Sequence, residues 1–195
     1  MAHDPHHAIA PGEHDKFMLY ALGKAALSPP AATKFCVGAC LVNGDTGEIL
    51  STGHSQELPG DRPGDPGNTH AEHCCFIKIS DQHGISEARI GEVLPKNTVL
   101  YTTMEPCNSR LTGNKSCVDR IIELKDAIRT VYVGVEEPGT FIAGNSGRGR
   151  LEAAGVRTVI LAGLEDRIMP ITMAGHGQNR SRIMRCILVK RRKTK

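Results

Sequence analysis

His70, Glu72, Cys107 and Cys117 combine the residue types that a catalytic zinc ion needs. Zinc binds imidazole nitrogen and thiolate sulfur readily, and three protein ligands leave its fourth tetrahedral position for water. A glutamate that is not a ligand can then carry protons between that water and a substrate. We therefore predict His70, Cys107 and Cys117 as the metal ligands and Glu72 as the catalytic acid–base group.

The spacing of the motif His70-Ala71-Glu72 constrains where its residues can lie. Residues two apart are about 200° apart around a helix axis, so they cannot share one face in the middle of a helix. In the first turn, side chains lean toward the N-terminus, and both can reach a metal placed beyond the helix end. The positive end of the helix also favours an anionic carboxylate and thiolates. We therefore predict a helix from His70 to about Ser80.

A structural zinc site is the alternative for these residues, and it would normally need a fourth protein ligand. Cys36 and Cys40 could not both serve, because four residues along a predicted strand separate them by roughly 13 Å. Cys74 and Cys75 follow on the predicted helix and are typical of buried packing residues, and Cys186 lies near the end of the chain. The sequence therefore favours an open metal site with a position left for water.

The elements that must position these residues follow from hydrophobic periodicity and from turn residues. We predict helices over 16–27, 70–80, 117–128 and 149–154, and strands over 35–42, 48–54, 98–103, 130–135 and 156–162. Residues 81–97 have room for one helical turn within loops. From residue 98 onward strands alternate with helices, which predicts parallel strands joined by right-handed crossovers. Sites in such sheets gather beyond the carboxyl ends of the strands.

The net charge of +3 conceals an uneven distribution. Residues 180–195 hold eight of the 24 basic side chains and none of the 21 acidic ones, so the remainder of the chain has a net charge of −5. Such a tail could contact RNA or anionic lipid, or it could be a solvated terminus.

The length of 195 residues favours one domain with a substantial core. We predict a flexible arm over residues 1–13, a single domain over residues 14–179 and a basic tail over residues 180–195. The sequence has neither a long apolar run nor the pattern of a signal peptide, so we expect no membrane span. Seven cysteines, an odd number, argue against a closed set of disulfides. We therefore expect reduced thiols and a cytoplasmic protein.

The motif His70-Ala71-Glu72, the run Thr103–Cys107 and the later Cys117 together resemble the cytidine deaminase superfamily over about residues 16–161. Zinc deaminases that act on bases carry the signature H-x-E…P-C-x-x-C. The resemblance implies a three-layer α/β/α sandwich with a mixed five-stranded sheet, Zn²⁺ as cofactor and a homodimer. It also implies hydrolytic loss of ammonia from a nucleobase-like ring. In that reaction Glu72 takes a proton from the attacking water, protonates the ring nitrogen and afterwards, with the second proton of that water, protonates the leaving amine.

The interval between the two cysteines departs from this signature, because nine residues separate Cys107 from Cys117 where the signature has two. A long loop here, with its pattern Asn-x-Arg-Leu-x-Gly-Asn, is similar to the fungal form of the riboflavin-pathway deaminases. Residues 144–147 and 151–156 also resemble that group. The implied reaction converts 2,5-diamino-6-ribitylamino-4(3H)-pyrimidinone 5′-phosphate to 5-amino-6-ribitylaminouracil 5′-phosphate and ammonia.

Polar residues near the predicted metal site are candidates for binding this substrate. Arg110 and Lys115 carry positive charge that suits a phosphate, although each could equally be a solvated surface residue. His54 lies near the end of the second predicted strand and loosely matches a substrate-binding histidine of the family. Glu136 and Asn145, past the strand over 130–135, could hydrogen-bond the ring or the ribityl chain.

Two other functions remain open from the sequence. A tRNA-editing deaminase or a cytidine or deoxycytidylate deaminase would use the same four residues, although the long cysteine loop counts against both. A non-catalytic, zinc-stabilised RNA-binding module would use the basic tail and would need no chemistry from Glu72. A Glu72→Gln variant separates this module from an enzyme.

Overall fold

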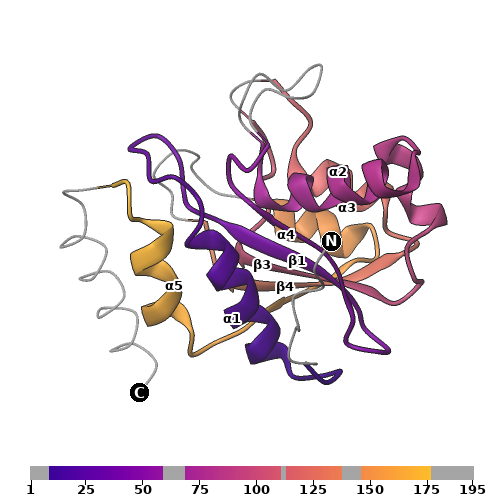
Figure 1. The fold of residues 1–195 in the computed structure, drawn as a ribbon, viewed down its shortest axis with the longest axis horizontal. Helices are drawn as coiled ribbons and strands as arrows, with labels where there is room; N and C mark the ends of the chain where they lie inside the picture. Colours follow the sequence, from indigo (N-terminus) through magenta and orange to yellow (C-terminus); the bar gives the residue numbers. More distant parts are fainter. Residues whose placement is uncertain (1–8, 59–68, 111–112, 138–145, 177–195) are drawn as a thin grey trace.

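The computed structural model describes residues 9–58, 69–110, 113–137 and 146–176. Its elements, drawn in Figure 1, are α1 (His14–Ala25), β1 (Gly38–Asn43), β2 (Ile49–His54), α2 (Ala71–His83), the 3-10 helix η1 (Glu87–Glu92), β3 (Thr98–Met104), α3 (Cys117–Glu123), β4 (Ile128–Val135), α4 (Gly147–Ala153), β5 (Arg157–Ile160) and α5 (Glu165–Thr172). Most of the predicted N-terminal arm and the whole predicted basic tail lie outside the described residues.

One mixed sheet of five strands forms the middle layer, in the order β2-β1-β3-β4-β5. β1 runs antiparallel to β2 and to β3. β3, β4 and β5 run parallel to one another, which confirms the parallel arrangement predicted after residue 98. The carboxyl ends of these three parallel strands therefore lie next to one another.

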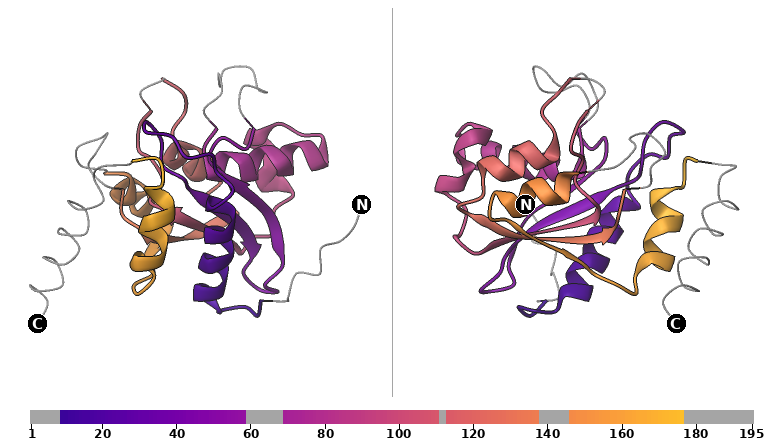
Figure 2. Two further views of the ribbon diagram at one scale, coloured as in Figure 1. Left: turned by 60° about the vertical axis from the view of Figure 1, so that its left-hand side comes forward. Right: turned by 180° about the vertical axis from the view of Figure 1, so that it is seen from behind.

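Helices cover both faces of this sheet, and Figure 2 shows the sheet between them. On one face α1 and α5 bury Phe17, Met18 and Ile168 against the strands. On the other face α2, α3 and α4 contribute apolar side chains to a second cluster, which also takes in Leu100 of β3. The neighbouring Tyr101 belongs to the first cluster, because successive side chains of a strand point to opposite faces. This confirms the three-layer α/β/α sandwich.

Most element predictions are confirmed to within three residues at each end, but the helix predicted over 117–128 ends at Glu123. Leu124 and Lys125 form turns, with their amide nitrogens bonded to the carbonyls three residues before. Ile128 already pairs with Thr98 as the start of β4. The apolar side chains beyond Glu123 therefore belong to a turn and a strand, so their helical spacing was misleading.

Two further differences concern the start of the first strand and the last helix. The first strand begins at Gly38, since the Cys36 amide bonds to Thr172 O at 3.0 Å and the Val37 amide to Ser55 Oγ at 3.1 Å, outside the ladder. Helix α5 was not predicted, and it contains Pro170, a residue normally excluded from helix interiors.

No helix in the described ranges combines the length and apolar character needed to cross a bilayer.

The approach of β2 to α2 fixes where the second helix begins. A Cβ atom at Gly53 would lie 2.2 Å from Ala71 O and 2.8 Å from the Cβ of Cys74. Only a residue without a side chain allows the first turn of α2 to lie this close to the strand. The start of α2, which follows His70 directly, is therefore held tightly against the sheet.

Candidate metal centre

The predicted ligands His70, Cys107 and Cys117 meet in space, and one donor atom of each lies within 4.8 Å of the other two. His70 is the N-cap of α2, with an extended backbone at φ −82° and ψ 159°. Cys107 lies three residues beyond β3, and Cys117 is the first residue of α3. Helix starts and a strand end thus bring three distant parts of the sequence to one place, beyond the carboxyl end of β3.

The separations between the donor atoms fit a zinc ion. Nδ1 of His70 lies 3.4 Å from Sγ of Cys107 and 3.5 Å from Sγ of Cys117. Tetrahedral bonds of about 2.0 Å to nitrogen and 2.3 Å to sulfur would place such donors about 3.5 Å apart. Imidazole nitrogen and thiolate sulfur are also donor types that suit zinc. These three residues would hold the metal.

Among the described residues, the cluster of possible ligands has these three members. The other described cysteines donate to backbone carbonyls elsewhere: Cys36 Sγ to Ser28 O at 3.7 Å, Cys40 Sγ to Phe17 O at 3.8 Å and Cys74 Sγ to His54 O at 3.4 Å. Cys75 is fully buried in the core cluster beneath α2. The described part of the chain therefore supplies three ligands, which would leave the fourth tetrahedral position of a zinc ion for water.

The two thiols at the site interact strongly. A hydrogen bond from Cys117 and another from His70 lower the pKa of Cys107, against the effect of its burial. The amide nitrogen of Cys117 also lies 3.4 Å from the Cys107 sulfur. The pKa of Cys117 is raised, first by the hydrogen bond to Cys107 and then by burial, while the Arg110 guanidinium opposes the rise. One thiolate thus forms readily, and a bound cation would favour the second.

Glu72 lies buried beside these donors, with 2% of its surface exposed. Its Oε1 lies 3.3 Å from Thr102 Oγ1, and its Oε2 lies 3.5 Å from the Cys117 sulfur. Burial raises the pKa of Glu72, and the charge on His70 opposes this rise. A carboxyl group with a raised pKa next to a metal site is a candidate for taking and returning a proton.

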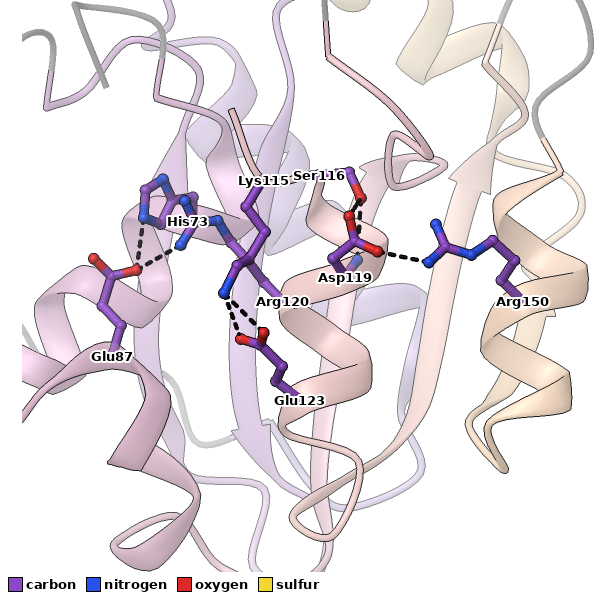
Figure 3. Close-up of polar contacts among 8 residues, drawn as sticks. All are labelled: His73, Glu87, Lys115, Ser116, Asp119, Arg120, Glu123 and Arg150. Atoms are coloured by element: carbon purple, nitrogen blue, oxygen red, sulfur yellow. Dashed lines mark hydrogen bonds and ion pairs between the residues drawn. The ribbon is translucent and has the colours of Figure 1, made fainter. Parts of the chain in front are cut away.

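A second set of contacts braces both cysteine segments, as Figure 3 shows in part. Arg150 on α4 donates to Asp119 Oδ1 at 2.6 Å and to Asn108 Oδ1 at 2.8 Å. The carboxylate of Asp119 in turn accepts a hydrogen bond from Ser116 Oγ. Ser116 is the N-cap of α3, and its hydroxyl accepts a hydrogen bond from the Asp119 amide. One arginine therefore ties the residue after the first ligand cysteine to the helix that begins with the second.

The two cationic candidates for phosphate binding have different surroundings. Arg110 is half-buried and close enough to Cys117 to influence its pKa. Lys115 donates to both carboxylate oxygens of Glu123, at 2.7 and 2.9 Å, on the exposed side of α3 (Figure 3). The charge of Lys115 is thus compensated within the chain. A phosphate-binding role for either residue stays a prediction.

The remaining substrate-binding candidates are placed as follows. His54 ends β2, and its Nδ1 lies 3.1 Å from Ser55 O, which leaves Nε2 as the other polar atom of the ring. Glu136 follows β4 directly and is exposed. Asn145 lies outside the described residues. Their roles stay predictions.

Sequence reasoning passed over two residues of the site. Thr102 lies two residues after Leu100 in β3, so the two side chains point to the same face of the sheet, the face that α2 covers. The hydroxyl of Thr102 therefore lies beside Glu72. Glu137 is half-buried, and its pKa rises to about 7, first because of burial and then because of charge on Cys107 and Glu105. The alternation of β3 could have identified Thr102, whereas the burial of Glu137 depends on the tertiary fold.

Comparisons with known proteins agree with this geometry. Residues 11–135 match the family model for the cytidine and deoxycytidylate deaminase zinc-binding region. A diaminohydroxyphosphoribosylamino-pyrimidine deaminase of Schizosaccharomyces pombe is 34% identical over 168 residues, which are 86% of this chain and 37% of that protein. The chain thus spans about a third of that relative.

Two crystal structures of the Aspergillus oryzae Rib2 deaminase, both C-terminal deletion mutants, share the fold. The structure at pH 4.6 is 40% identical with a TM-score of 0.77, over 89% of this chain and 98% of that one. The complex with DARIPP is 41% identical with a TM-score of 0.74, over 87% and 94% of the two chains. With its matched zinc-binding region and its cluster of one histidine and two cysteines, the chain belongs to the cytidine and deoxycytidylate deaminase family.

Proposed function

We propose that this chain is a zinc-dependent hydrolytic deaminase of riboflavin biosynthesis. It would convert 2,5-diamino-6-ribitylamino-4(3H)-pyrimidinone 5′-phosphate to 5-amino-6-ribitylaminouracil 5′-phosphate and release ammonia. The observation that carries this proposal is the buried Glu72 carboxylate beside the cluster of His70, Cys107 and Cys117. The choice of substrate is supported by the deaminase relatives of Schizosaccharomyces pombe and Aspergillus oryzae, and by the DARIPP complex of the latter.

The chemistry divides between the metal and Glu72. A bound zinc ion lowers the pKa of water from its bulk value to about 7. Glu72 would accept one proton from the attacking water and deliver it to the ring nitrogen; it would then take the second proton, from the hydroxyl now on the ring carbon, and deliver it to the amine, which leaves as ammonia while that hydroxyl becomes the carbonyl. The Thr102 hydroxyl, which can donate to Met104 O at 2.9 Å or to Oε1 of Glu72 at 3.3 Å, is the neighbour that orients that oxygen during the transfers. The burial of Glu72 excludes bulk water that would compete for the proton.

The substrate phosphate needs cationic donors, and Arg110 is the stronger candidate. Its guanidinium lies close enough to Cys117 to influence that thiol, while the ammonium of Lys115 is engaged with Glu123. A planar guanidinium also matches a phosphate better than an ammonium does. His54, Glu136 and Asn145 complete the set of proposed contacts to the ring and the ribityl chain.

Ammonia release from a panel of substrates tests the proposal. The zinc-loaded chain is incubated separately with the diaminopyrimidine ribityl phosphate, cytidine, dCMP and a tRNA anticodon stem-loop. We expect ammonia from the first alone. Release from one of the other three, with none from the first, would identify a different deaminase. Zinc binding without release from any of them, together with RNA binding, would identify the non-catalytic module.

The proposal extends to the state of the whole chain. We propose a homodimer in the cytoplasm, with one folded domain over residues 14–179. The six cysteines within the described ranges are all free, which supports a reducing compartment. Light scattering coupled to size-exclusion chromatography measures the mass, and a value of one chain would contradict the dimer.

A further inference from the structure

The separation between His70 and Cys117 depends on how two helices sit against each other. His70 directly precedes α2, and Cys117 is the first residue of α3. A shift of either helix relative to the other would therefore move one of these donors away from the second. The distance between them is 3.5 Å from Nδ1 to Sγ, so a displacement of less than one ångström would disturb the site.

A single carboxylate links these two helices. Glu87, at the start of η1, places its Oε2 2.7 Å from Nε2 of His73 on α2 and 2.9 Å from Nη1 of Arg120 on α3. Figure 3 shows this oxygen between the two side chains. The side chain of His73 is 3% exposed and that of Arg120 is 17% exposed, while the Glu87 side chain is 30% exposed, so both contacts are partly shielded from solvent.

The positions of the two partners relate directly to the metal ligands. His73 lies three residues after His70, and Arg120 lies three residues after Cys117. Three residues are close to one helical turn, so Glu87 joins the helices one turn below the donors. We propose that Glu87 is a positioning residue that sets the separation of His70 and Cys117 through its bridge between His73 and Arg120.

Two other ion pairs of η1 and α3 do not connect α2 with α3. Glu92, on the same 3-10 helix, pairs with Arg89 three residues before it, and both side chains are more than half exposed. Glu123 pairs with Lys115 at the surface of α3. Exposed pairs contribute little, because water screens them and ordering two long side chains costs entropy. Glu92 therefore offers a matched control, with the same residue type on the same element.

Metal binding measured on variants of these two glutamates tests the inference, which rests on the proposed zinc site and not on the identity of the substrate. Glu87→Gln and Glu87→Ala are compared with Glu92→Gln and Glu92→Ala in the full chain. Zinc affinity is measured by competition with a chelating dye, and the Co²⁺-loaded proteins are compared by their visible absorption. Circular dichroism verifies the fold of each variant.

We expect the Glu87 variants to bind zinc about 10-fold more weakly, at the lower end of the effects of outer-shell residues on metal affinity, and to show shifted Co²⁺ bands. The Glu92 variants should match the wild type. Folded Glu87 variants with wild-type affinity and wild-type bands would overturn the inference. If Glu87→Ala does not fold, the near-isosteric Glu87→Gln decides by the same criteria. A wild-type chain that binds no zinc would instead overturn the proposed function, and this inference with it.

Discussion

At the scale of single residues, the environment of Glu72 opposes its ionisation. Desolvation raises the pKa of this carboxyl group, and the nearby His70 offsets the rise only in part. A carboxyl whose pKa is higher in the folded than in the unfolded chain loses stabilising effect as the pH rises above the unfolded value of about 4.3. This carboxyl group therefore destabilises the metal-free fold at neutral pH, a cost that is common for the catalytic role proposed for it.

A Glu72→Gln variant should reveal this cost. We expect the metal-free variant to unfold at a higher temperature than the metal-free wild type at pH 7, because the amide carries no charge to desolvate. The difference should narrow as the pH falls toward about 4, where the wild-type carboxyl becomes protonated in both states. Thermal unfolding in the presence of a chelator measures both quantities. An equal melting temperature of the two proteins at pH 7 would contradict this explanation.

Loss of a ligand should weaken metal binding far more than loss of a neighbouring thiol. Cys117→Ala removes one of three donors, so we expect zinc affinity to fall by more than about 100-fold, beyond the range typical of outer-shell changes. Cys74→Ala is the matched control, since this buried thiol donates to His54 O and is not part of the cluster. Zinc titration against a chelating dye gives both affinities. Similar losses in the two variants would exclude Cys117 as a ligand.

At the scale of elements, local pattern predicted β3, β4 and the start of α2 well. The apolar pattern of each of these elements is bounded by turn-forming residues close to the observed ends of the element. The end of α3 was not predictable in this way, because Leu124 and Ile128 keep helical spacing while they belong to a turn and to β4. Helix α5 escaped prediction because Pro170 interrupts its pattern, and packing on the sheet, in which Ile168 is fully buried, stabilises it there.

Some features of the candidate site were likewise predictable from the sequence, and others were not. His70, Glu72, Cys107 and Cys117 stood out because their residue types and spacing are specific to zinc chemistry. The contact of Thr102 with Glu72, the burial of Glu137 and the pairing of Lys115 with Glu123 depend on tertiary neighbours. Spacing along the chain therefore identifies the donors, while their surroundings require the fold.

The contact between β2 and α2 gives a prediction at this scale. Gly53→Ala introduces a methyl group 2.2 Å from Ala71 O, so strand and helix must separate. We expect the free energy of unfolding to fall by about 1–3 kcal/mol, as for other overpacked sites. Gly149→Ala serves as control, because no atom lies within 4 Å of its added Cβ in α4, and alanine favours a helix. Urea unfolding measures both, and equal effects of the two substitutions would refute the steric argument.

At the scale of the whole molecule, a bound metal ion would connect three segments that lie far apart in the sequence. The three donors come from the start of α2, the segment after β3 and the start of α3. A ligand that binds only the folded chain stabilises it in proportion to the logarithm of the ligand concentration. Zinc should therefore act on global stability as well as on catalysis.

Metal removal tests this expectation. Above the dissociation constant, each tenfold increase in free zinc should raise the free energy of unfolding by about 1.4 kcal/mol. Urea unfolding in zinc-buffered solutions measures the slope. Magnesium should have no comparable effect, because it prefers oxygen ligands to imidazole and thiolate. Stability that is independent of zinc, or equally dependent on magnesium, would contradict a zinc site in the folded chain.

The central claim is that Glu72 beside a bound zinc ion deaminates the diaminopyrimidine ribityl phosphate. Its most direct test measures ammonia release from that substrate by the zinc-loaded wild type and by Glu72→Gln, with the zinc content of both proteins determined in parallel. We predict rapid release by the wild type and at least about 100-fold slower release by the variant at equal zinc content, the usual size of a general acid–base contribution. Equal rates in the two proteins, or no ammonia from the zinc-loaded wild type, would contradict the claim.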